Sequence, residues 1–217
     1  MATILRDLSY RYQWLYDGIS RIAALAVGGE ARFRQLALEG LEINAGSIVL
    51  DLCCGSGQTT GVLVQRSQHV TGLDASPLSI RRAKQNVPEA QYVEAFAENM
   101  PFSDHTFDVV HTSAAMHEME ASQLREILQE VHRVLKPGGH FAMVDFHAPI
   151  NPIFVPGLAV FFWLFETETA WQLIQTNLEE ILREIGFEVR SSTLYAGGSL
   201  QTIQAQKRSD SKQLINQ

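Results

Sequence analysis

The stretch V-L-D-L-C-C-G-S-G at residues 49–57 decides the fold. An apolar run over residues 47–52 ends in small residues and glycines, which is typical of a buried parallel strand that turns directly into a helix. Gly55 and Gly57 can adopt backbone angles closed to other residues, and the small side chains let a ligand approach the backbone. Many nucleotide-binding folds share this pattern, and a tight turn without a ligand is the alternative interpretation.

Strand and helix patterns alternate along most of the chain. Further strands are predicted at residues 69–74, 91–96, 107–112, 140–146, 187–195 and 199–206. Helices are predicted within residues 6–41, at 59–65, after the capping pair Ser76-Pro77, at 122–135 and at 176–185. The run Pro137-Gly138-Gly139 is expected to close the helix at 122–135, and Gly197-Gly198 suits an antiparallel pair of strands.

This order of elements predicts an α/β fold. We expect a Rossmann-like, seven-stranded, mostly parallel sheet with an antiparallel C-terminal strand, helices on both faces and an N-terminal helical extension. In such a sheet the ligand site lies at the carboxyl ends of the strands. Those ends carry Asp51, Asp74, the segment 111–117 and the segment 145–147.

Composition and charge narrow the function classes. The 217 residues are 46% hydrophobic and 19% charged, as in ordinary globular proteins. The net charge of −7 disfavours nucleic acid as a partner, because an acidic surface repels phosphate groups. The longest apolar stretch, residues 153–165, contains Pro156 and Gly157 and is shorter than the roughly 20 residues that cross a bilayer. Because the N-terminus also lacks a signal-like apolar run, a cytoplasmic protein that does not span the membrane is expected.

The two cysteines, Cys53 and Cys54, are adjacent in the sequence. Neighbouring cysteines do not make a disulfide framework, and no further ligands with zinc spacing accompany them. A thiol nucleophile or a metal pair is the alternative, but small packing residues are favoured and no metal site is expected.

Asp74 ends the second predicted strand and is a candidate for binding a ribose. Its carboxylate can accept both ribose hydroxyls, and hydrogen bonds to a charged group contribute about 1.5–3 kcal/mol each. Capping of the next helix is the alternative, but Ser76 can already serve there. NAD sites place an acidic residue at the same position. The run C-C-G-S-G-Q-T-T nevertheless disfavours a dinucleotide, because Thr60 stands where the third glycine of G-x-G-x-x-G should be.

Three later segments carry a family resemblance. They are A-E-N-M-P-F-S-D-H-T-F-D at 97–108, R-V-L-K-P-G-G at 133–139 and Y-A-G-G-S-L-Q-T-I-Q-A-Q-K at 195–207. Together with residues 49–57 and the D-A-S-P-L-S-I run at 74–80, they have the order and spacing of the class I S-adenosylmethionine-dependent methyltransferases. From about Tyr10 to Lys207 the chain resembles the ubiquinone/menaquinone C-methyltransferase branch in particular. The resemblance implies methyl transfer from S-adenosylmethionine to a small acceptor.

The resemblance also assigns roles around the methyl donor. Four residues would line the methionine end of S-adenosylmethionine: Asp51, Cys53, Gly55 and Gly57. Asp74 would hold the ribose and Ala75 would lie beside the adenine, while Thr112 begins a segment, 112–117, that would pass close to the sulfonium.

The adenine end departs from the family pattern. Ala97 and Glu98 fall in the block that usually flanks the adenine, but Phe96 stands where the family often has an acidic residue that binds the exocyclic amine. Adenine recognition would therefore fall to backbone groups or to Glu98.

The acceptor side differs as well. The quinone branch often shows G-L-R-N after the fourth strand, whereas this chain has A-A-M-H-E-M at 114–119, so a prenylated quinone does not follow directly. The stretch 151–171 lies where such enzymes place substrate-covering elements, and its six large aromatic residues suit a lipophilic ring or tail: Phe154, Phe161, Phe162, Trp163, Phe165 and Trp171. Packing under a lid helix or against a partner chain is the alternative.

Methylation of carbon or of a phenol benefits from a general base, and histidine titrates near neutrality. His117 is the first candidate, with Glu118 as the residue that orients its ring, and His147 is the second. His111 also lies near the strand ends, and a surface or helix-capping role is the alternative for each histidine. Asp145 is expected to end its strand and shape the pocket.

The chain is expected to be a single methyltransferase domain over residues 1–217. Its parts would be a helical cap at 1–44, a cofactor-binding core at 45–148, a substrate-covering segment with the C-terminal strands at 149–208, and a tail at 209–217.

A catalytically silent S-adenosylmethionine-binding partner protein and an NAD-dependent oxidoreductase are the competing functions. A lipophilic substrate would be compatible with peripheral contact to a membrane, although no strongly basic amphipathic helix supports it. The oligomeric state is left open.

Overall fold

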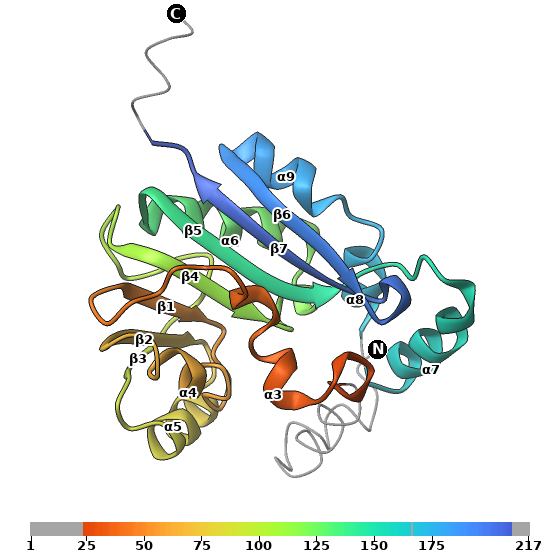
Figure 1. Ribbon diagram of the computed structural model, residues 1–217, viewed down its shortest axis with the longest axis horizontal. Helices are drawn as coiled ribbons and strands as arrows, with labels where there is room; N and C mark the ends of the chain where they lie inside the picture. Colours follow the sequence, from red (N-terminus) through yellow and green to blue (C-terminus); the bar gives the residue numbers. More distant parts are fainter. Residues whose placement is uncertain (1–23, 166, 210–217) are drawn as a thin grey trace, which may run out of the picture.

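Seven strands of the computed structural model form one sheet in the order β3-β2-β1-β4-β5-β7-β6 (Figure 1). The structure describes residues 24–165 and 167–209, so the predicted helices before residue 24 and the tail after 209 lie outside the described residues. The strands are β1 (Ile48–Leu52), β2 (His69–Asp74), β3 (Gln91–Glu94), β4 (Phe107–Ser113), β5 (Leu135–Phe146), β6 (Phe187–Tyr195) and β7 (Leu200–Lys207).

The strand directions confirm the predicted fold class. The first five strands pair in parallel, whereas β7 lies antiparallel between β5 and β6. Strands β1 and β4 are neighbours although two strands separate them in the sequence, so the strand order reverses at this pair. The carboxyl ends of parallel strands meet at one edge of a sheet, and a reversal leaves a crevice there.

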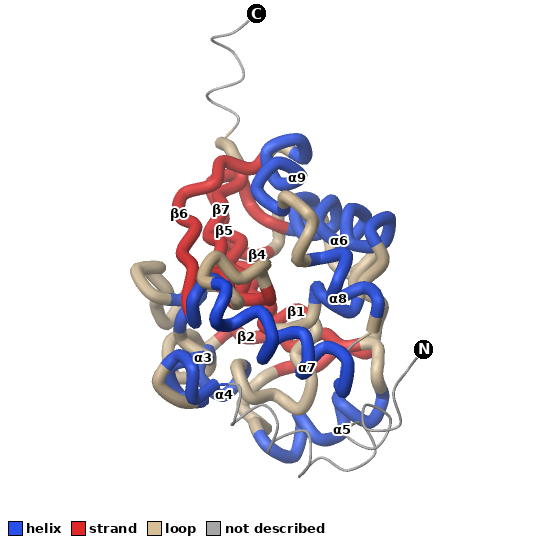
Figure 2. The backbone as a smooth tube through the Cα atoms, turned by 90° about the vertical axis from the view of Figure 1, so that its right-hand side faces the viewer, coloured by secondary structure: helices blue, strands red, loops and turns tan. Residues whose placement is uncertain are grey.

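Helices cover both faces of the sheet, as Figure 2 shows. The longer helices are α5 (Pro77–Asn86), α6 (Ala121–Val134), α7 (Val155–Phe165) and α9 (Leu178–Ile185). The shorter helical elements are η1 (Leu25–Val27), α3 (Glu30–Phe33), η2 (Leu36–Leu38), α4 (Thr60–Leu63), η3 (Met116–Glu118), η4 (Pro152–Phe154), α8 (Glu168–Leu173) and η5 (Ala196–Gly198). None of the described helices is long and apolar enough to cross a membrane.

Two layers of apolar side chains hold these helices on the sheet. On one face, α6, α8 and α9 contribute the buried Ile127, Leu173 and Leu182 to the main core. On the other face, η2 and α4 bury Leu38 and Leu63. The parallel strands are therefore covered on both faces, and this explains why their sequences consist of nearly continuous apolar residues.

Local capping signals fix several helix ends. The Ser76 hydroxyl accepts a hydrogen bond from the Ser79 backbone N–H at 3.2 Å, and Pro77 occupies the first position of α5, as predicted. Helix α9 begins after Asn177, whose side chain accepts from the Glu180 N–H, and it ends at Gly186 with φ of 115°.

The prediction that Pro137-Gly138-Gly139 closes the preceding helix is wrong. Helix α6 ends at Val134, and residues 135–139 already belong to β5. Leu135 pairs with Phe107 and His140 with Val109, so residues 136–139 bulge out of the ladder. Gly139 suits this bulge because a Cβ there would lie 2.9 Å from the Lys136 carbonyl oxygen.

Lys207 secures this C-terminal end of α6. Its ammonium donates hydrogen bonds to the carbonyl oxygens of His132 and Leu135 at 2.6 and 2.9 Å, groups that the helix end leaves without an intrahelical partner. The ring of His132 packs edge-on against Phe187 at 5.0 Å. Burial, and secondly the charge of Lys207, lowers the pKa of His132 from 6.5 to about 4.

This pKa makes stability depend on pH. Between pH 6.5 and about 4 the unfolded chain protonates His132 but the folded chain does not, so the free energy of unfolding falls as the pH drops through this window. We expect His132→Gln to lose less stability than the wild type over the same window, as measured by urea unfolding at pH 7, 5.5 and 4. Equal losses in both proteins would contradict the depressed pKa.

Candidate active site

A cavity of about 370 Å³ lies at the carboxyl edge of the sheet, within the usual range of small-molecule sites. The loops after β1, β2, β3 and β4 contribute Cys53–Gly55, Asp74–Ser76, Ala95–Glu98 and Ser113–Ala115 to its wall. Arg34, which follows α3, lines it from the N-terminal side. The cavity therefore sits at the reversal of strand order, where the ligand site was predicted.

Asp74 joins two of these loops. Its carboxylate oxygens accept hydrogen bonds from the backbone N–H groups of Gly55 and Ser76, both at 2.9 Å. Burial raises the pKa of Asp74, while the two N–H donors act in the opposite direction. A carboxylate has about four lone-pair sites, so two donors leave acceptor capacity toward the cavity. Asp74 thus takes part in the helix start, as the alternative interpretation held, and still lines the cavity.

Asp51 lies deeper, at the junction of β1 and β4. One carboxylate oxygen accepts from the Thr60 hydroxyl at 2.6 Å, and the other lies 3.0 Å from Nδ1 of His111. Asp51 and His111 face each other in register on the neighbouring strands, and both are buried. Thr60, which stands in place of the third glycine of a dinucleotide loop, therefore holds a carboxylate instead of leaving room for a diphosphate.

The two cysteines do not behave as nucleophiles here. Burial, followed by the negative charge of nearby Asp74 and Glu118, raises the pKa of Cys53 well above its usual value. Burial and the charge of Asp51 do the same for Cys54. Both thiols therefore stay protonated at neutral pH, and the thiolate is the reactive form. Within the described residues no group of three or more His, Cys, Asp or Glu side chains is arranged to hold a metal ion.

The charges that line the cavity are unbalanced. Among the described residues in its wall, the acidic side chains are Asp51, Asp74, Glu98 and Glu118, whereas the basic ones are Arg34 and Arg82. Arg34 lies 3.5 Å from the carboxylate of Glu30, outside the wall, which offsets part of its charge. The wall therefore favours a cationic ligand group over an anionic one.

The adenine end of the predicted site is partly preorganised. Glu98 accepts a hydrogen bond from the Gln123 side-chain amide at 3.1 Å, so its orientation is fixed by α6. Phe96 lines the cavity with 65% of its surface exposed, and the strand expected to include it ends at Glu94. Ala75 and Ala97 lie in the same wall.

His117 lies behind the cavity wall and is held by an unexpected partner. Asp145, at the end of β5, accepts from the backbone N–H groups of residues 115–117, and its other oxygen lies 2.7 Å from Nδ1 of His117. Asp145 thus orients this ring through Nδ1, whereas Glu118, the partner expected from the sequence, is among the residues that line the cavity. The ring of His117 is buried and packs edge-on against Phe146 at 4.7 Å.

The structure brings together most, but not all, of the predicted site. Seven predicted cofactor residues line the cavity: Asp51, Cys53, Gly55, Asp74, Ala75, Ala97 and Glu98. Four predicted residues do not: Gly57, Thr112, His117 and His147. Thr112 is buried, and its neighbour Ser113 takes its place in the wall because successive strand residues face opposite sides. Nδ1 of the half-buried His147 lies 2.7 and 3.0 Å from the carbonyl oxygens of Ala148 and Gly198.

Gly57 serves the packing beneath the loop. It adopts a positive φ of 86°, and a Cβ there would lie 3.4 Å from Ala83 of α5. Sequence reasoning missed several residues of the wall, namely Arg34, Gln58, Arg82, Glu118, Met119 and Gln123. Arg34 and Gln123 come from elements far from the glycine loop in the sequence, so no local motif marks them.

The aromatic residues of the segment 151–171 pack mainly among themselves. Phe162 is fully buried and contacts Phe146 and Trp171 at ring distances of 5.0 and 5.1 Å. Trp163 is 74% exposed, and none of the aromatic residues described in this segment lines the cavity. The side chain of Phe165 lies outside the described part of the chain. The sequence left two interpretations of this segment open, substrate contact and internal packing. Phe162 follows the second, because it is buried against other aromatic rings.

Comparison with known proteins agrees with this geometry. A family model described as a methyltransferase domain matches residues 49–139. An uncharacterized methyltransferase from Synechocystis sp. is 59% identical over 205 residues, which is 94% of this chain and 97% of that protein. The chain belongs to the class I methyltransferases.

Other relatives put this methyltransferase near the ubiquinone/menaquinone branch, as the motifs predicted. A 2-phytyl-1,4-naphtoquinone methyltransferase from Nostoc punctiforme is 32% identical over 161 residues, covering 70% of this chain and 68% of that one. A demethylmenaquinone methyltransferase from Paenarthrobacter aurescens is 24% identical, with coverage of 99% and 89%. An S-adenosylmethionine dependent methyltransferase from Mesorhizobium loti has the same fold, with a TM-score of 0.63 at 21% identity over 82% of this chain and 99% of that one.

Removal of the Asp145 carboxylate tests its structural role in this methyltransferase. Asp145→Ala would leave the buried N–H groups of residues 115–117 without their acceptor, and each unsatisfied buried group costs about 1–3 kcal/mol. We expect the free energy of unfolding to fall by about 3 kcal/mol or more in urea titrations. The control Asp104→Ala breaks a solvent-exposed ion pair with Arg133 and should leave the free energy of unfolding almost unchanged. Similar losses in the two variants would contradict this role.

Proposed function

We propose that this chain transfers a methyl group from S-adenosylmethionine to a small, lipophilic, quinol-like acceptor. The observation that carries the proposal is the acidic cavity at the reversal of strand order, built on the motifs of a methyltransferase. In this proposal residues 1–44 form a cap, 45–148 hold the methyl donor, and 149–208 cover the acceptor. A cytoplasmic location is part of the same proposal.

The chemistry of the wall fits this donor. S-adenosylmethionine supplies a methyl group on a cationic sulfonium, which the four acidic side chains of the wall would attract. NAD carries two phosphate groups instead, and the same charges would repel them. The acidic wall therefore supports a methyl donor over the competing NAD-dependent oxidoreductase.

Individual residues have proposed tasks around the donor. Asp74 has acceptor capacity left for the ribose hydroxyls, and Glu98 lies in the wall with Ala75 and Ala97, where the adenine is proposed. Asp51 and Cys53 would border the methionine end. Gly57 and Thr112, which do not line the cavity, would support this end from behind.

The protein mainly has to position the reactants. The acceptor's electron pair forms the new bond to the methyl carbon, the sulfur keeps the electrons of the broken bond, and a proton leaves the acceptor. Holding the three reacting atoms in line without water can supply up to roughly 7–11 kcal/mol. His117 is the first proposed proton acceptor; it lies behind the wall, so the proton would reach it through an intervening polar group, and Asp145 orients its ring through Nδ1. His147, which also lies outside the wall, is the second candidate.

The acceptor class is supported by the relatives. Two of them are methyltransferases named for 2-phytyl-1,4-naphtoquinone and demethylmenaquinone. The exposed aromatic and aliphatic side chains of the segment 151–171 suit a ring with a long apolar tail. The departure at residues 114–119 from the branch's G-L-R-N pattern would place this chain's acceptor outside the exact quinones of those relatives.

Isothermal titration of the purified chain with S-adenosylmethionine and with NAD tests the donor. We expect binding of S-adenosylmethionine alone, and a loss of about ten- to a hundredfold in affinity in Asp74→Asn, since each hydrogen bond to the charged group contributes about 1.5–3 kcal/mol. The control Asp104→Asn removes an exposed carboxylate outside the cavity and should bind like the wild type. Folding of each variant is checked by thermal unfolding.

Three outcomes would change the proposal. No binding of S-adenosylmethionine by the folded wild type would refute it. Binding of NAD instead would favour the oxidoreductase. Tight binding of S-adenosylmethionine without S-adenosylhomocysteine formation with any quinol or phenol tested would favour a catalytically silent binding partner.

The base is tested separately from donor binding. In His117→Gln we expect unchanged affinity for S-adenosylmethionine but a fall of roughly 10²–10⁴-fold in the rate of methyl transfer to a naphthoquinol acceptor. His147→Gln serves as the comparison, because it removes the other candidate. A normal transfer rate in His117→Gln with a strong defect in His147→Gln would reverse the two assignments.

A further inference from the structure

An apolar surface covers η4 and α7 and continues from Ile150. We call it the α7 surface and define it by five exposed side chains: Ile150, Ile153, Val155, Val160 and Trp163. Ile153 and Trp163 are the most exposed, at 78% and 74%. Residues 148–165 contain no Asp, Glu, Lys, Arg or His, in a chain that is 19% charged. Contiguous apolar surface of this kind marks an interaction site.

Helix α7 lacks the polar face that a helix exposed to water normally has. Its inner side is anchored by the buried Phe162, and its outer side carries Val160 and Trp163. A helix that is apolar all round is stable only when its outer side is also covered by protein or lipid. The α7 surface therefore needs an apolar partner.

The surface is held rigidly on the sheet. The backbone N–H groups of Ile150 and Asn151 donate to the Gly197 carbonyl oxygen, in the turn between β6 and β7, at 3.0 and 2.9 Å. Gly197 has a positive φ of 63°, and the ring of Phe154 occupies the space that a side chain there would need. The exposed side chains are thus presented by a fixed support.

The α7 surface lies on the same side of the molecule as the cavity, at the carboxyl edge of the sheet. Figures 1 and 2 both show α7 beyond the carboxyl ends of the parallel strands. Its inner residues Phe161 and Phe162 contact Phe146, which packs on His117, and Glu118 and Met119 next to His117 line the cavity. One packed aromatic cluster therefore joins the α7 surface to the cavity wall.

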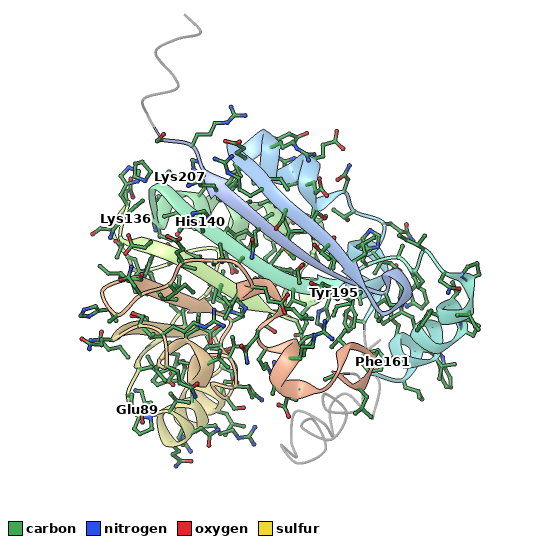
Figure 3. The ribbon with its side chains drawn as sticks, viewed as in Figure 1. Glu89, Lys136, His140, Phe161, Tyr195 and Lys207 are labelled. Carbon is green, nitrogen blue, oxygen red and sulfur yellow. The ribbon has the colours of Figure 1, made fainter. Side chains whose placement is uncertain are left out.

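We propose that the α7 surface docks this methyltransferase on a lipid bilayer, with the cavity turned toward the membrane. The proposal rests on the proposed function, because a quinol with a long apolar tail resides in the bilayer. An uncharged surface is the part of a chain with net charge −7 that can approach lipid without repulsion. In Figure 3 the charged residues Glu89, Lys136 and Lys207 lie far from Phe161 of α7, and the exposed Trp163 suits the membrane–water boundary.

Co-sedimentation of the full chain with phosphatidylcholine vesicles tests the docking. We expect binding that neither added salt nor partial replacement by phosphatidylglycerol strengthens, because no basic residue takes part. The double variant Ile153→Ser/Trp163→Ser should lower the partition coefficient by roughly tenfold or more. The control Leu78→Ser removes an exposed apolar side chain at the start of α5, outside the α7 surface, and should weaken binding far less than the double variant.

Titration with S-adenosylmethionine without vesicles separates the possible failures. Unchanged affinity in the double variant shows that it is folded, since neither residue lines the cavity. Wild type that binds S-adenosylmethionine but not the vesicles would overturn the docking alone. Concentration-dependent dimers that the double variant abolishes, with no vesicle binding, would assign the α7 surface to a second copy of the chain. No binding of the donor would refute the proposed function instead, whatever the vesicles show.

Discussion

The reversal of strand order between β1 and β4 is the constraint on which the site depends. The chain builds outward from β1 to β3 and then returns to the other side of β1, so the crossover helices cover opposite faces and the loops above the junction diverge. Asp51 and His111 meet in register across this junction and hydrogen-bond in the interior. Their contact joins the two halves of the sheet directly beneath the cavity.

Carboxylates at the ends of β2 and β5 hold the loops around the site by accepting hydrogen bonds from backbone N–H groups. Asp74 links the glycine loop to the start of α5, and Asp145 gathers three backbone N–H groups after β4. Buried N–H groups require acceptors, and a carboxylate can serve several at once. The groups expected to meet the ligand therefore also fix the loops around it, so the cavity is shaped before any ligand arrives.

The segment 151–171 combines packing with exposure. Phe162 and Trp171 close the aromatic cluster behind the cavity, whereas Ile153 and Trp163 face outward. One side of α7 therefore packs on the protein interior, and its other apolar side is available to a partner surface. In the function proposed above, this arrangement would link the collection of a lipophilic acceptor to the wall of the cavity.

Local signals in the sequence determined the strands, the helix cap at Ser76 and the glycine loop, because backbone sterics and short-range hydrogen bonds act over a few residues. The same motifs identified Asp51, Asp74 and Glu98 as neighbours of one cavity. Tertiary structure alone decided that Asp145 rather than Glu118 holds His117, that Ser113 rather than Thr112 lines the wall, and that Arg34 reaches it. The partner of a buried polar group depends on which strands the fold brings together, and a shift of one residue along a strand turns a side chain to the other face.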